Sequence, residues 1–373
     1  MSELRFNVKE VLPLLTQCSK VVLPKNSFPI FDNIMFERKG DKLLATASDN
    51  EQWLSVKLPL LYGDMDNPFC INAKDFIEAM KNLGDIDVTL CFDEESHKVT
   101  CDYGSGHFQL PFVGADVFPR AKEEKEGVVE QIMGANNVLR MIEKTWFAIA
   151  NDELRPIMNG IHFDFFKDKV VSASSDGHKL AKCCDTSISH EEEVVYGFTM
   201  PSKTANVLKN ILPSMGDEVK MAFNSGSLII SNSMFRLSSR LVDMRYPNYD
   251  AVIPKTHEAT YDIDRKSLLG ALKRVMPMGN ITSELVSLTF KHGQCIISAE
   301  DIDFAKSASE TLQCDYQGKD LTIGFKGSSL MQILSNLDGD NAVIELTDAT
   351  KAAIIYDVNK EDYLSLLMPM LLN

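Results

Sequence analysis

The sequence predicts an α+β protein made of three similar domains. The chain has 373 residues, 45% of them hydrophobic and 24% charged, so it has enough apolar material for folded cores and is not a disordered chain. This length allows two or three domains of roughly 100 to 200 residues each. Four sequence landmarks recur three times in the same order, at steps near a third of the chain, which favours three domains over two.

Each repeat is expected to begin with a helix. Segments with apolar residues at helical spacing start at Asn7, Asn136 and Asp264. In the second segment Val138 and Ile142 fall on one face, and Asn136 is the expected N-cap. Each of these helices should therefore pack an apolar face against a core.

The strands and a second helix follow at regular steps. A pair of β-rich runs ends in an acidic turn at Asp49, Asp176 and Asp301, with steps of 127 and 125 residues. The second helix then ends at a Gly-Asp turn, and an alternating strand closes the repeat. These Gly-Asp turns are Gly84-Asp85, Gly216-Asp217 and Gly339-Asp340, and the closing strands begin at Phe108, Phe235 and Ala353.

The landmarks place three domains at residues 1–121, 128–254 and 259–373. The charged stretch from Arg120 to Gly127 is the expected linker between the first two domains, and Pro254-Lys255 marks the second joint. A chance similarity of apolar patterns could produce one match, but it does not explain four landmarks in one order.

Composition excludes several classes of protein. With 38 basic and 53 acidic residues the net charge is −15, so the whole surface cannot hold nucleic acid by charge. The first residues lack a signal peptide, and no run approaches the ~18 apolar residues of a membrane span. We therefore expect a cytoplasmic protein without a membrane partner.

The eight cysteines include no C-x-x-C pair, which predicts free buried thiols. The sequence has no cluster of His, Cys and Asp residues at metal-binding spacing, so it predicts no metal site. It also lacks the G-x-x-x-x-G-K-[ST] loop that would predict ATP binding. We expect no cofactor.

Positive charge is concentrated in the six expected helices, residues 7–22, 73–83, 136–150, 202–212, 265–276 and 328–337. They carry a net charge of +8, whereas the rest of the chain carries −23. If equivalent helices face one way, they form a basic surface suited to a phosphate backbone, although the last helix has no basic residue. Such contacts hold DNA without reading its sequence. The basic residues are Lys9, Lys20, Lys74, Lys81, Arg140, Lys144, Lys203, Lys209, Arg265, Lys266, Lys273 and Arg274.

Four local strings then become informative. They are L-R-P-I-M-N-G-I from Leu154, S-S-D-G-H-K-L-A from Ser174, S-R-L-V-D-M-R-Y-P-N-Y-D-A-V-I-P from Ser239, and the terminal M-P-M from Met368. With the length and the repeat order, they make the chain resemble the bacterial sliding clamp family, the beta subunits of DNA polymerase III. The resemblance covers essentially the whole chain.

The resemblance implies a homodimeric ring of two copies joined head to tail, with helices lining a hole for duplex DNA and sheets outside. It implies a non-catalytic processivity factor for DNA replication. The implied partners are double-stranded DNA, a second copy of the chain, the DNA polymerase III catalytic subunit, the clamp loader and other proteins with a clamp-binding motif. Its implied DNA set comprises the basic helix residues except Arg265, together with Lys25.

The resemblance also implies a groove for partner peptides, which adaptable methionines would suit. From the residues alone, Met368 and Met370 would be assigned to the core. The implied peptide set is Met158, Ser175, Gly177, His178, Lys179, Leu180, Pro247, Val252, Leu366, Met368, Pro369 and Met370.

At the subunit joint the resemblance places the edge strand of the first domain against the first helix of the third domain of the other copy. The implied joint set is Phe108, Leu110, Met276 and Met278. The chain departs from the family after M-P-M, where Leu371 and Leu372 stand in place of the common arginine and leucine and Asn373 extends the end.

Two other functions remain possible from the residues. Asp176 and His178, near Ser175, could serve a cytosolic hydrolase, although adjacent residues on one turn rarely reach triad geometry and no G-x-S-x-G elbow exists. Alternatively, the chain could be a repeat scaffold without a DNA role.

Overall fold

The computed structural model describes residues 3–40, 42–65, 67–121, 126–188, 196–317 and 319–372. The chain packs as two compact units. Unit 1 comprises Met1–Leu139 and Lys203–Leu241, and unit 2 comprises Arg140–Ser202 and Val242–Asn373. The middle repeat contributes to both units, so the packing units and the sequence repeats do not coincide. The expected linker lies partly outside the described residues, because 122–125 are not among them.

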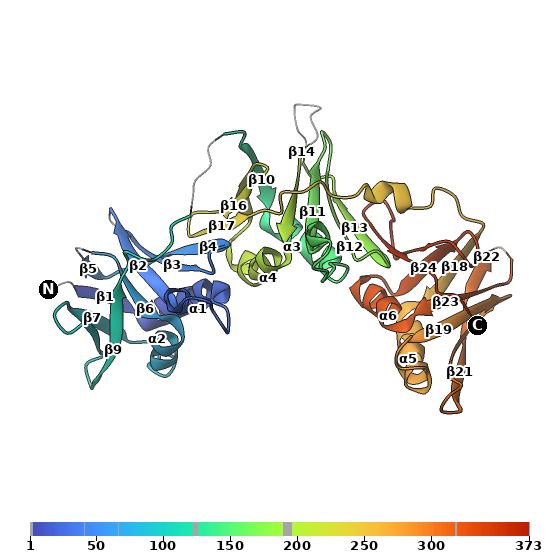
Figure 1. Cartoon of the computed structure of the whole chain (residues 1–373), viewed down its shortest axis with the longest axis horizontal. Helices are drawn as coiled ribbons and strands as arrows, with labels where there is room; N and C mark the ends of the chain where they lie inside the picture. Colours follow the sequence, from blue (N-terminus) through green and yellow to red (C-terminus); the bar gives the residue numbers. More distant parts are fainter. Residues whose placement is uncertain are drawn as a thin grey trace. The chain divides into compact units, whose positions relative to one another are not determined.

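Each repeat has one strand, a helix, a group of strands, a second helix and three closing strands, in that order (Figure 1). The group between the two helices has five strands in the first and third repeats and four among the described residues of the second. The first contains β1 (Glu3–Asn7), α1 (Val8–Cys18), η1 (Ser19–Val21), η2 (Pro29–Asp32), β2 (Asn33–Lys39), β3 (Lys42–Ser48), β4 (Gln52–Leu58), β5 (Tyr62–Asp64), β6 (Phe69–Asn72), α2 (Ala73–Met80), β7 (Asp87–Asp93), β8 (Lys98–Asp102) and β9 (His107–Gly114). The second contains β10 (Val129–Gly134), α3 (Ala135–Trp146), η3 (Pro156–Met158), β11 (Gly160–Phe165), β12 (Val170–Ser175), β13 (Lys179–Asp185), β14 (Tyr196–Pro201), α4 (Ser202–Ile211), η4 (Leu212–Ser214), β15 (Glu218–Phe223), β16 (Ser227–Ser231), β17 (Phe235–Arg240) and η5 (Tyr249–Val252). The third contains β18 (Ala259–Asp264), α5 (Arg265–Val275), η6 (Met276–Met278), β19 (Leu285–Lys291), β20 (Gln294–Asp301), β21 (Lys306–Gln313), β22 (Asp315–Gln317), β23 (Leu321–Lys326), α6 (Gly327–Asn336), β24 (Asn341–Leu346), β25 (Ala353–Tyr356) and β26 (Tyr363–Leu367).

The sheets run across repeat boundaries inside each unit. Unit 1 has one sheet in the order β10-β15-β16-β17-β4-β3-β2-β6-β9-β8-β7-β1-β5, in which β17 of the second repeat pairs with β4 of the first. Unit 2 has a sheet in the order β14-β11-β12-β13-β26-β25-β24-β18-β22, in which β13 of the second repeat pairs with β26 of the third. A separate sheet of unit 2 has the order β21-β20-β19-β23. All these pairings are antiparallel.

The helices pack apolar faces against these sheets. In α1 the residues Val8, Val11, Leu15 and Cys18 are buried at helical spacing. Helix α1 contacts α2 as well as strands β3 and β4, and in unit 2 α5 contacts α6 (Figure 1). The two-helix content expected for each repeat is therefore correct.

Three details differ from the sequence-based expectation. A strand (β1, β10 or β18) precedes the first helix of each repeat. Helix α3 begins at Ala135, so Asn136 lies in its first turn and is not the N-cap. The third repeat closes with β26 and not with the strand at Ala353, because β25 occupies the place of β8 and β16 in the repeat order. An alternating pattern does not distinguish consecutive strands of one meander.

The Gly-Asp turns have a role that the sequence did not indicate. In every repeat, a backbone carbonyl at the turn after the second helix accepts a hydrogen bond from the first residue of the first helix. The bonds join Val8 N to Ile86 O at 2.9 Å, Ala135 N to Asp217 O at 2.8 Å and Arg265 N to Asp340 O at 2.8 Å. They satisfy one of the N–H groups that a helix start leaves without an intrahelical partner. The turn therefore ties the two helices of a repeat together.

Replacing Gly216 should destabilise the fold through this turn. Gly216 has φ +79°, a conformation that costs other residues about 1–2 kcal/mol, so Gly216→Ala should lower the free energy of unfolding by about 1 kcal/mol. Urea unfolding followed by circular dichroism measures the change. Gly134→Ala is the matched control, because an added Cβ there meets nothing closer than 3.5 Å. Equal midpoints for the two variants would contradict the role of the turn.

Candidate functional site

The peptide set lies entirely in unit 2, on four segments of the chain, two of which strand pairing brings together. Strand β13 pairs with β26, with Lys179 opposite Leu367 and Leu180 opposite Leu366. Met158, at the end of η3, belongs to the same hydrophobic cluster as Leu180 and Leu366. Strand pairing thus places residues nearly 190 positions apart in the sequence next to one another.

The peptide set divides into a buried part and an exposed part. Met158, Lys179, Leu180 and Leu366 are buried, and Ser175, Pro369 and Met370 are partly buried. Gly177, His178 and Pro247 are exposed, as are Val252 at 56% and Met368 at 41%. The assignment of Met368 to the core from its residue type is therefore wrong, because it lies on the surface.

The turn between β12 and β13 is held by its own side chains. The Asp176 carboxylate accepts hydrogen bonds from the backbone N–H groups of His178 and Lys179, both at 2.8 Å, and from Lys179 Nζ. Burial acts to raise the pKa of Asp176, but these hydrogen bonds outweigh it and hold that pKa below its ordinary value. Gly177 supplies the positive φ of +90° that the turn requires.

This geometry gives the hydrolase hypothesis no support. Ser175 Oγ donates to Lys179 O at 2.9 Å, and the Asp176 carboxylate is used within the turn. Within the described chain no hydrogen bond joins the His178 imidazole to either residue. The three residues therefore shape a turn and do not form a nucleophile, base and orienting acid.

The C-terminal segment is held at both ends. Met368 N donates to His178 O and Met370 N donates to Gly324 O, each at 2.8 Å. A Cβ on Gly324 would lie 2.7 Å from Met370 O, so this approach requires glycine. The two bonds fix M-P-M across the end of the β12–β13 turn. Leu371 beyond it is exposed, and Asn373 lies outside the described residues.

A polar network that sequence reasoning missed supports the tyrosines of this region. Tyr249 OH donates to Asp164 Oδ2 at 2.6 Å, and His162 stacks on Tyr246 with ring centroids 4.7 Å apart. Burial first, and then the hydrogen bond to Asp164, raise the pKa of Tyr249. Both tyrosines belong to the cluster around Leu366. The string R-Y-P-N-Y contains both tyrosines, but nothing in the sequence indicated that Asp164 would be the hydrogen-bond partner of Tyr249.

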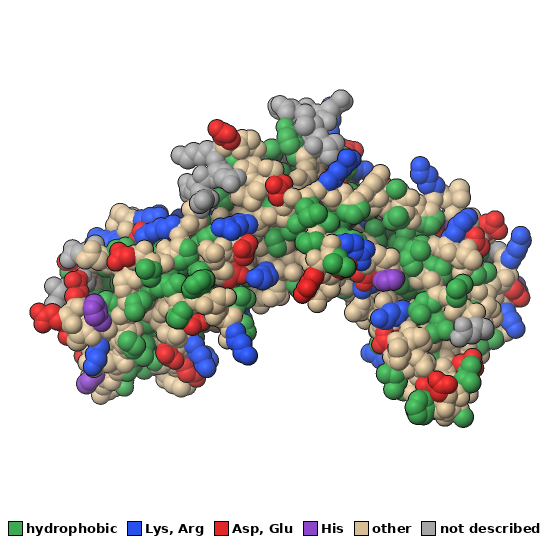
Figure 2. Space-filling view, viewed as in Figure 1, with side chains coloured by type: hydrophobic (Ala, Val, Ile, Leu, Met, Phe, Trp, Pro, Cys, Tyr) green, Lys and Arg blue, Asp and Glu red, His purple; other side chains and the backbone are tan. Residues whose placement is uncertain are grey.

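Most of the DNA set is exposed, but acidic residues lie beside it. Lys9 Nζ is 2.8 Å from Asp85 and Lys266 Nζ is 3.2 Å from Asp340, so the aspartates of two Gly-Asp turns face the first helices of their repeats. Arg274 pairs with Glu310. On the face shown in Figure 2, Lys and Arg side chains are interspersed with Asp and Glu. The charge separation along the sequence is therefore reduced by ion pairs in the fold.

Lys144 differs from the other members of the DNA set. It is 8% exposed, its ammonium lies 2.7 Å from Asp338 and donates to Asn336 O, and it lies over the Tyr363 ring. These contacts join α3 to the third repeat within unit 2. Lys144 is thus held as a packing residue, and the helical spacing could not reveal this partner.

The joint set lies on strand β9 and on the short helix η6. Strand β9 pairs with β8 over His107–Pro111 and with β6 over Phe112–Gly114, so its first half has β8 as its one strand partner among the described residues. Phe108 and Leu110 lie in that half and are partly buried. Met276 is partly buried in η6, and Met278 is 42% exposed.

The described residues contain no group of three His, Cys, Asp or Glu side chains placed to hold a metal ion. No helix among them is long and apolar enough to span a membrane. The eight cysteines are free, and burial raises the pKa of Cys183 to about 11, so its thiolate form is disfavoured.

Comparison with known proteins covers the chain almost from end to end. Three models of the DNA polymerase III beta subunit match in order, the N-terminal domain at residues 3–122, the central domain at 133–248 and the C-terminal domain at 250–371. The beta sliding clamp of Haemophilus influenzae is 25% identical over 97% of this chain and 98% of its own length. That of Pseudomonas aeruginosa is 26% identical over 94% of each chain.

Solved structures share the fold. The DNA polymerase III subunit beta of Pseudomonas aeruginosa superposes with a TM-score of 0.94 at 24% identity, over 99% of this chain and 100% of that one. A DnaN sliding clamp from Bartonella birtlesii, solved with griselimycin bound, gives 0.92 at 25% identity over the full length of both. Because three successive domain models and the whole fold agree, this chain belongs to the family of DNA polymerase III beta subunits, the beta sliding clamps.

Proposed function

We propose that this chain is a DNA sliding clamp that holds duplex DNA by enclosure and tethers the replicative polymerase to it. The succession of three clamp domains over residues 3–371 carries this proposal. The family is a non-catalytic accessory subunit, which agrees with the use of Ser175 and Asp176 in a turn. We place the three domains at 1–121, 128–254 and 259–373, each of which contains one full set of two helices and its strands.

Enclosure explains how a chain with a large net negative charge can stay on DNA. A topological link needs no strong attraction, so a net charge of −15 costs little. The exposed ion pairs of Lys9 and Lys266 are weak and screened by salt, so these lysines can exchange a carboxylate for a phosphate. We assign DNA contact to Lys9, Lys20, Lys25, Lys74, Lys81, Arg140, Lys203, Lys209, Lys266, Lys273 and Arg274, and omit the buried Lys144.

Two copies would supply six similar domains, and a heterologous contact that closes on itself gives a ring. We propose that Phe108 and Leu110, on the half of β9 that pairs with β8, meet Met276 and Met278 of the second copy. Strand pairing at this joint would cover the unpaired backbone groups of His107–Pro111, which otherwise invite aggregation.

We further propose that the peptide set binds a short linear segment of each partner protein. The buried Met158, Leu180 and Leu366 give a fixed apolar floor, and the exposed Val252 and Met368 give an adaptable wall. The partners would be the catalytic subunit of DNA polymerase III, the clamp loader and other proteins with the same motif, acting with the replication machinery in the cytoplasm.

Loading on circular DNA tests the enclosure. Incubated with a clamp loader, ATP and a nicked circular plasmid, the protein should stay with the DNA through gel filtration in high salt. Cutting the plasmid once should release the protein, because a ring can slide off a free DNA end without breaking any protein–DNA contact. Equal retention on circular and linear DNA would contradict enclosure.

Leu110→Asp supplies the matched control for this experiment. It should yield monomers by analytical ultracentrifugation and abolish retention, because a carboxylate would be buried at the joint. Gln109→Asp adds the same charge on the neighbouring, exposed position of β9 and should leave both properties unchanged.

Val252→Asp tests the peptide set. A carboxylate on this apolar wall should weaken binding of a fluorescent peptide carrying the clamp-binding motif at least tenfold, measured by fluorescence anisotropy. Val358→Asp is the control, since Val358 is 82% exposed in the same unit and lies outside the peptide set. Unchanged affinity in Val252→Asp would show that the peptide binds elsewhere.

A further inference from the structure

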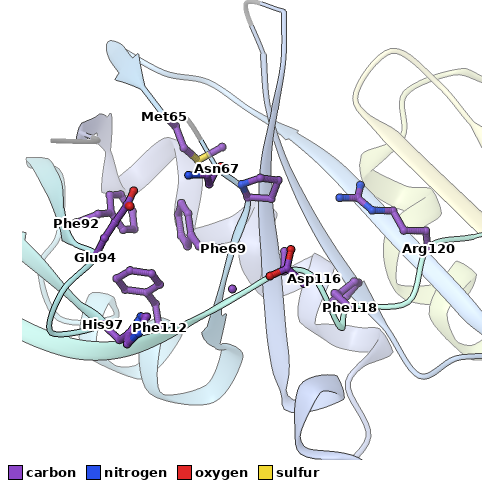
Figure 3. Close-up of a pocket in the computed structure, with 13 residues that line it drawn as sticks. Met65, Asn67, Phe69, Phe92, Glu94, His97, Phe112, Asp116, Phe118 and Arg120 are labelled. Atoms are coloured by element: carbon purple, nitrogen blue, oxygen red, sulfur yellow. The ribbon is translucent and has the colours of Figure 1, made fainter.

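A cavity in the first repeat is lined by residues that belong to none of the peptide, DNA and joint sets. It has a volume of about 430 Å³, within the range of small-molecule sites, and its walls come from unit 1 alone (Figure 3). The walls are Met65, Asn67 and Pro68 with the start of β6, the end of β7 with the following turn, the second half of β9, and residues between Ala115 and Arg120. The cavity therefore sits where β9 leaves β8 and pairs with β6.

Three packed phenylalanine rings form the apolar side of the cavity. The centroids of Phe69 and Phe92 are 4.2 Å apart, and Phe112 lies 5.7 Å from Phe92 and 6.1 Å from Phe69 with its plane steeply inclined to both. Each is at most 8% exposed. Phe36 stacks on Phe69 from the core side at 5.1 Å. The rings are thus held in place and present a preformed aromatic wall.

Two carboxylates stand at the rim of this wall. In Figure 3 Glu94 lies on the Phe92 side of the cavity and Asp116 on the Phe118 side. Within the described chain neither has an ion-pair partner. The Asp93 carboxylate accepts hydrogen bonds from the backbone N–H groups of Glu95 and Ser96 and from Ser96 Oγ, which fixes the turn that carries Glu94.

The one permanent cation of the lining is already engaged. Arg120 Nη1 lies 2.6 Å from Glu37 Oε1, and in Figure 3 Arg120 is at the end of the cavity away from Glu94. The rim therefore has an excess of negative charge. Carboxylates and the faces of aromatic rings both attract a cation, and the phenylalanine wall favours an apolar body on the same molecule.

We propose that this cavity binds a small organic cation, an ammonium or guanidinium group carried on an apolar body. The apolar body packs on Phe69, Phe92 and Phe112, and the cation lies between Glu94 and Asp116. An anion would meet two carboxylates, and a neutral apolar molecule would leave both of them without a counter-charge.

Titration with 2-phenylethylammonium tests the proposal in the full-length protein. The protein resonances of His97, which lines the cavity, should shift by NMR with a dissociation constant of about 1 mM, as expected for so small a ligand. The neutral analogue 2-phenylethanol and the anion 3-phenylpropionate should bind at least tenfold more weakly. Absence of binding, or equal affinity of the neutral analogue, would overturn the proposal.

The double variant Glu94→Gln with Asp116→Asn should weaken the amine at least tenfold while leaving 2-phenylethanol unchanged. Glu95→Gln removes the same charge from the same turn but outside the cavity, so it should bind the amine like the wild type. If Glu95→Gln weakens binding as much as the double variant, the effect is one of general surface charge and the site is refuted. Loading on circular DNA is unaffected by either result, so this test is independent of the clamp function.

Discussion

Antiparallel strand pairing across repeat boundaries is the constraint on which the other features depend. An edge strand with unpaired N–H and C=O groups needs a partner, and in each unit the second repeat supplies it, through β17 on β4 and β13 on β26. The β13–β26 pairing fixes the register of Leu180 against Leu366 and brings the C-terminal segment to the His178 turn. The peptide set is therefore a product of sheet continuity. Within β9 the segment His107–Pro111 pairs with β8 on one side only, and this segment is the one assigned to the subunit joint.

Electrostatics acts locally in this molecule. The helices collect basic residues, but Asp85 and Asp340, from two of the Gly-Asp turns, lie beside the first helices of their repeats and take part in exposed ion pairs. Such pairs give up their partners readily, because each charge remains hydrated. A protein built this way makes many weak, replaceable contacts with phosphate and no strong ones. Weak contacts suit a clamp that must move along DNA, provided that enclosure prevents its escape.

The repeat pattern was sufficient to predict the fold class and the two helices of each repeat. Apolar spacing and Gly-Asp turns are local signals, which can be identified without knowing which distant residues they contact. Features that depend on distant partners were not accessible. Lys144 has the spacing of a surface lysine, and only the structure shows Asp338 beside it. Met368 has the composition of a core residue, yet the bond from its N–H to His178 holds it at the surface. The third closing strand was assigned one strand too early, since β25 and β26 are both short and largely buried. The cavity at Phe69, Phe92 and Phe112 could not be foreseen, because these residues in a sequence indicate only a core.

The lifetime of the loaded protein on end-blocked DNA, measured against salt concentration, tests enclosure most directly. Binding by charge alone loses affinity with a slope of about −0.9 per phosphate contact in a plot of log affinity against log salt. An enclosing clamp should instead show a lifetime that is nearly independent of salt between 50 and 300 mM, roughly the range over which ordinary non-specific binding collapses. A steep fall in lifetime over that range would mean that the basic side chains hold the DNA by attraction, and it would contradict enclosure.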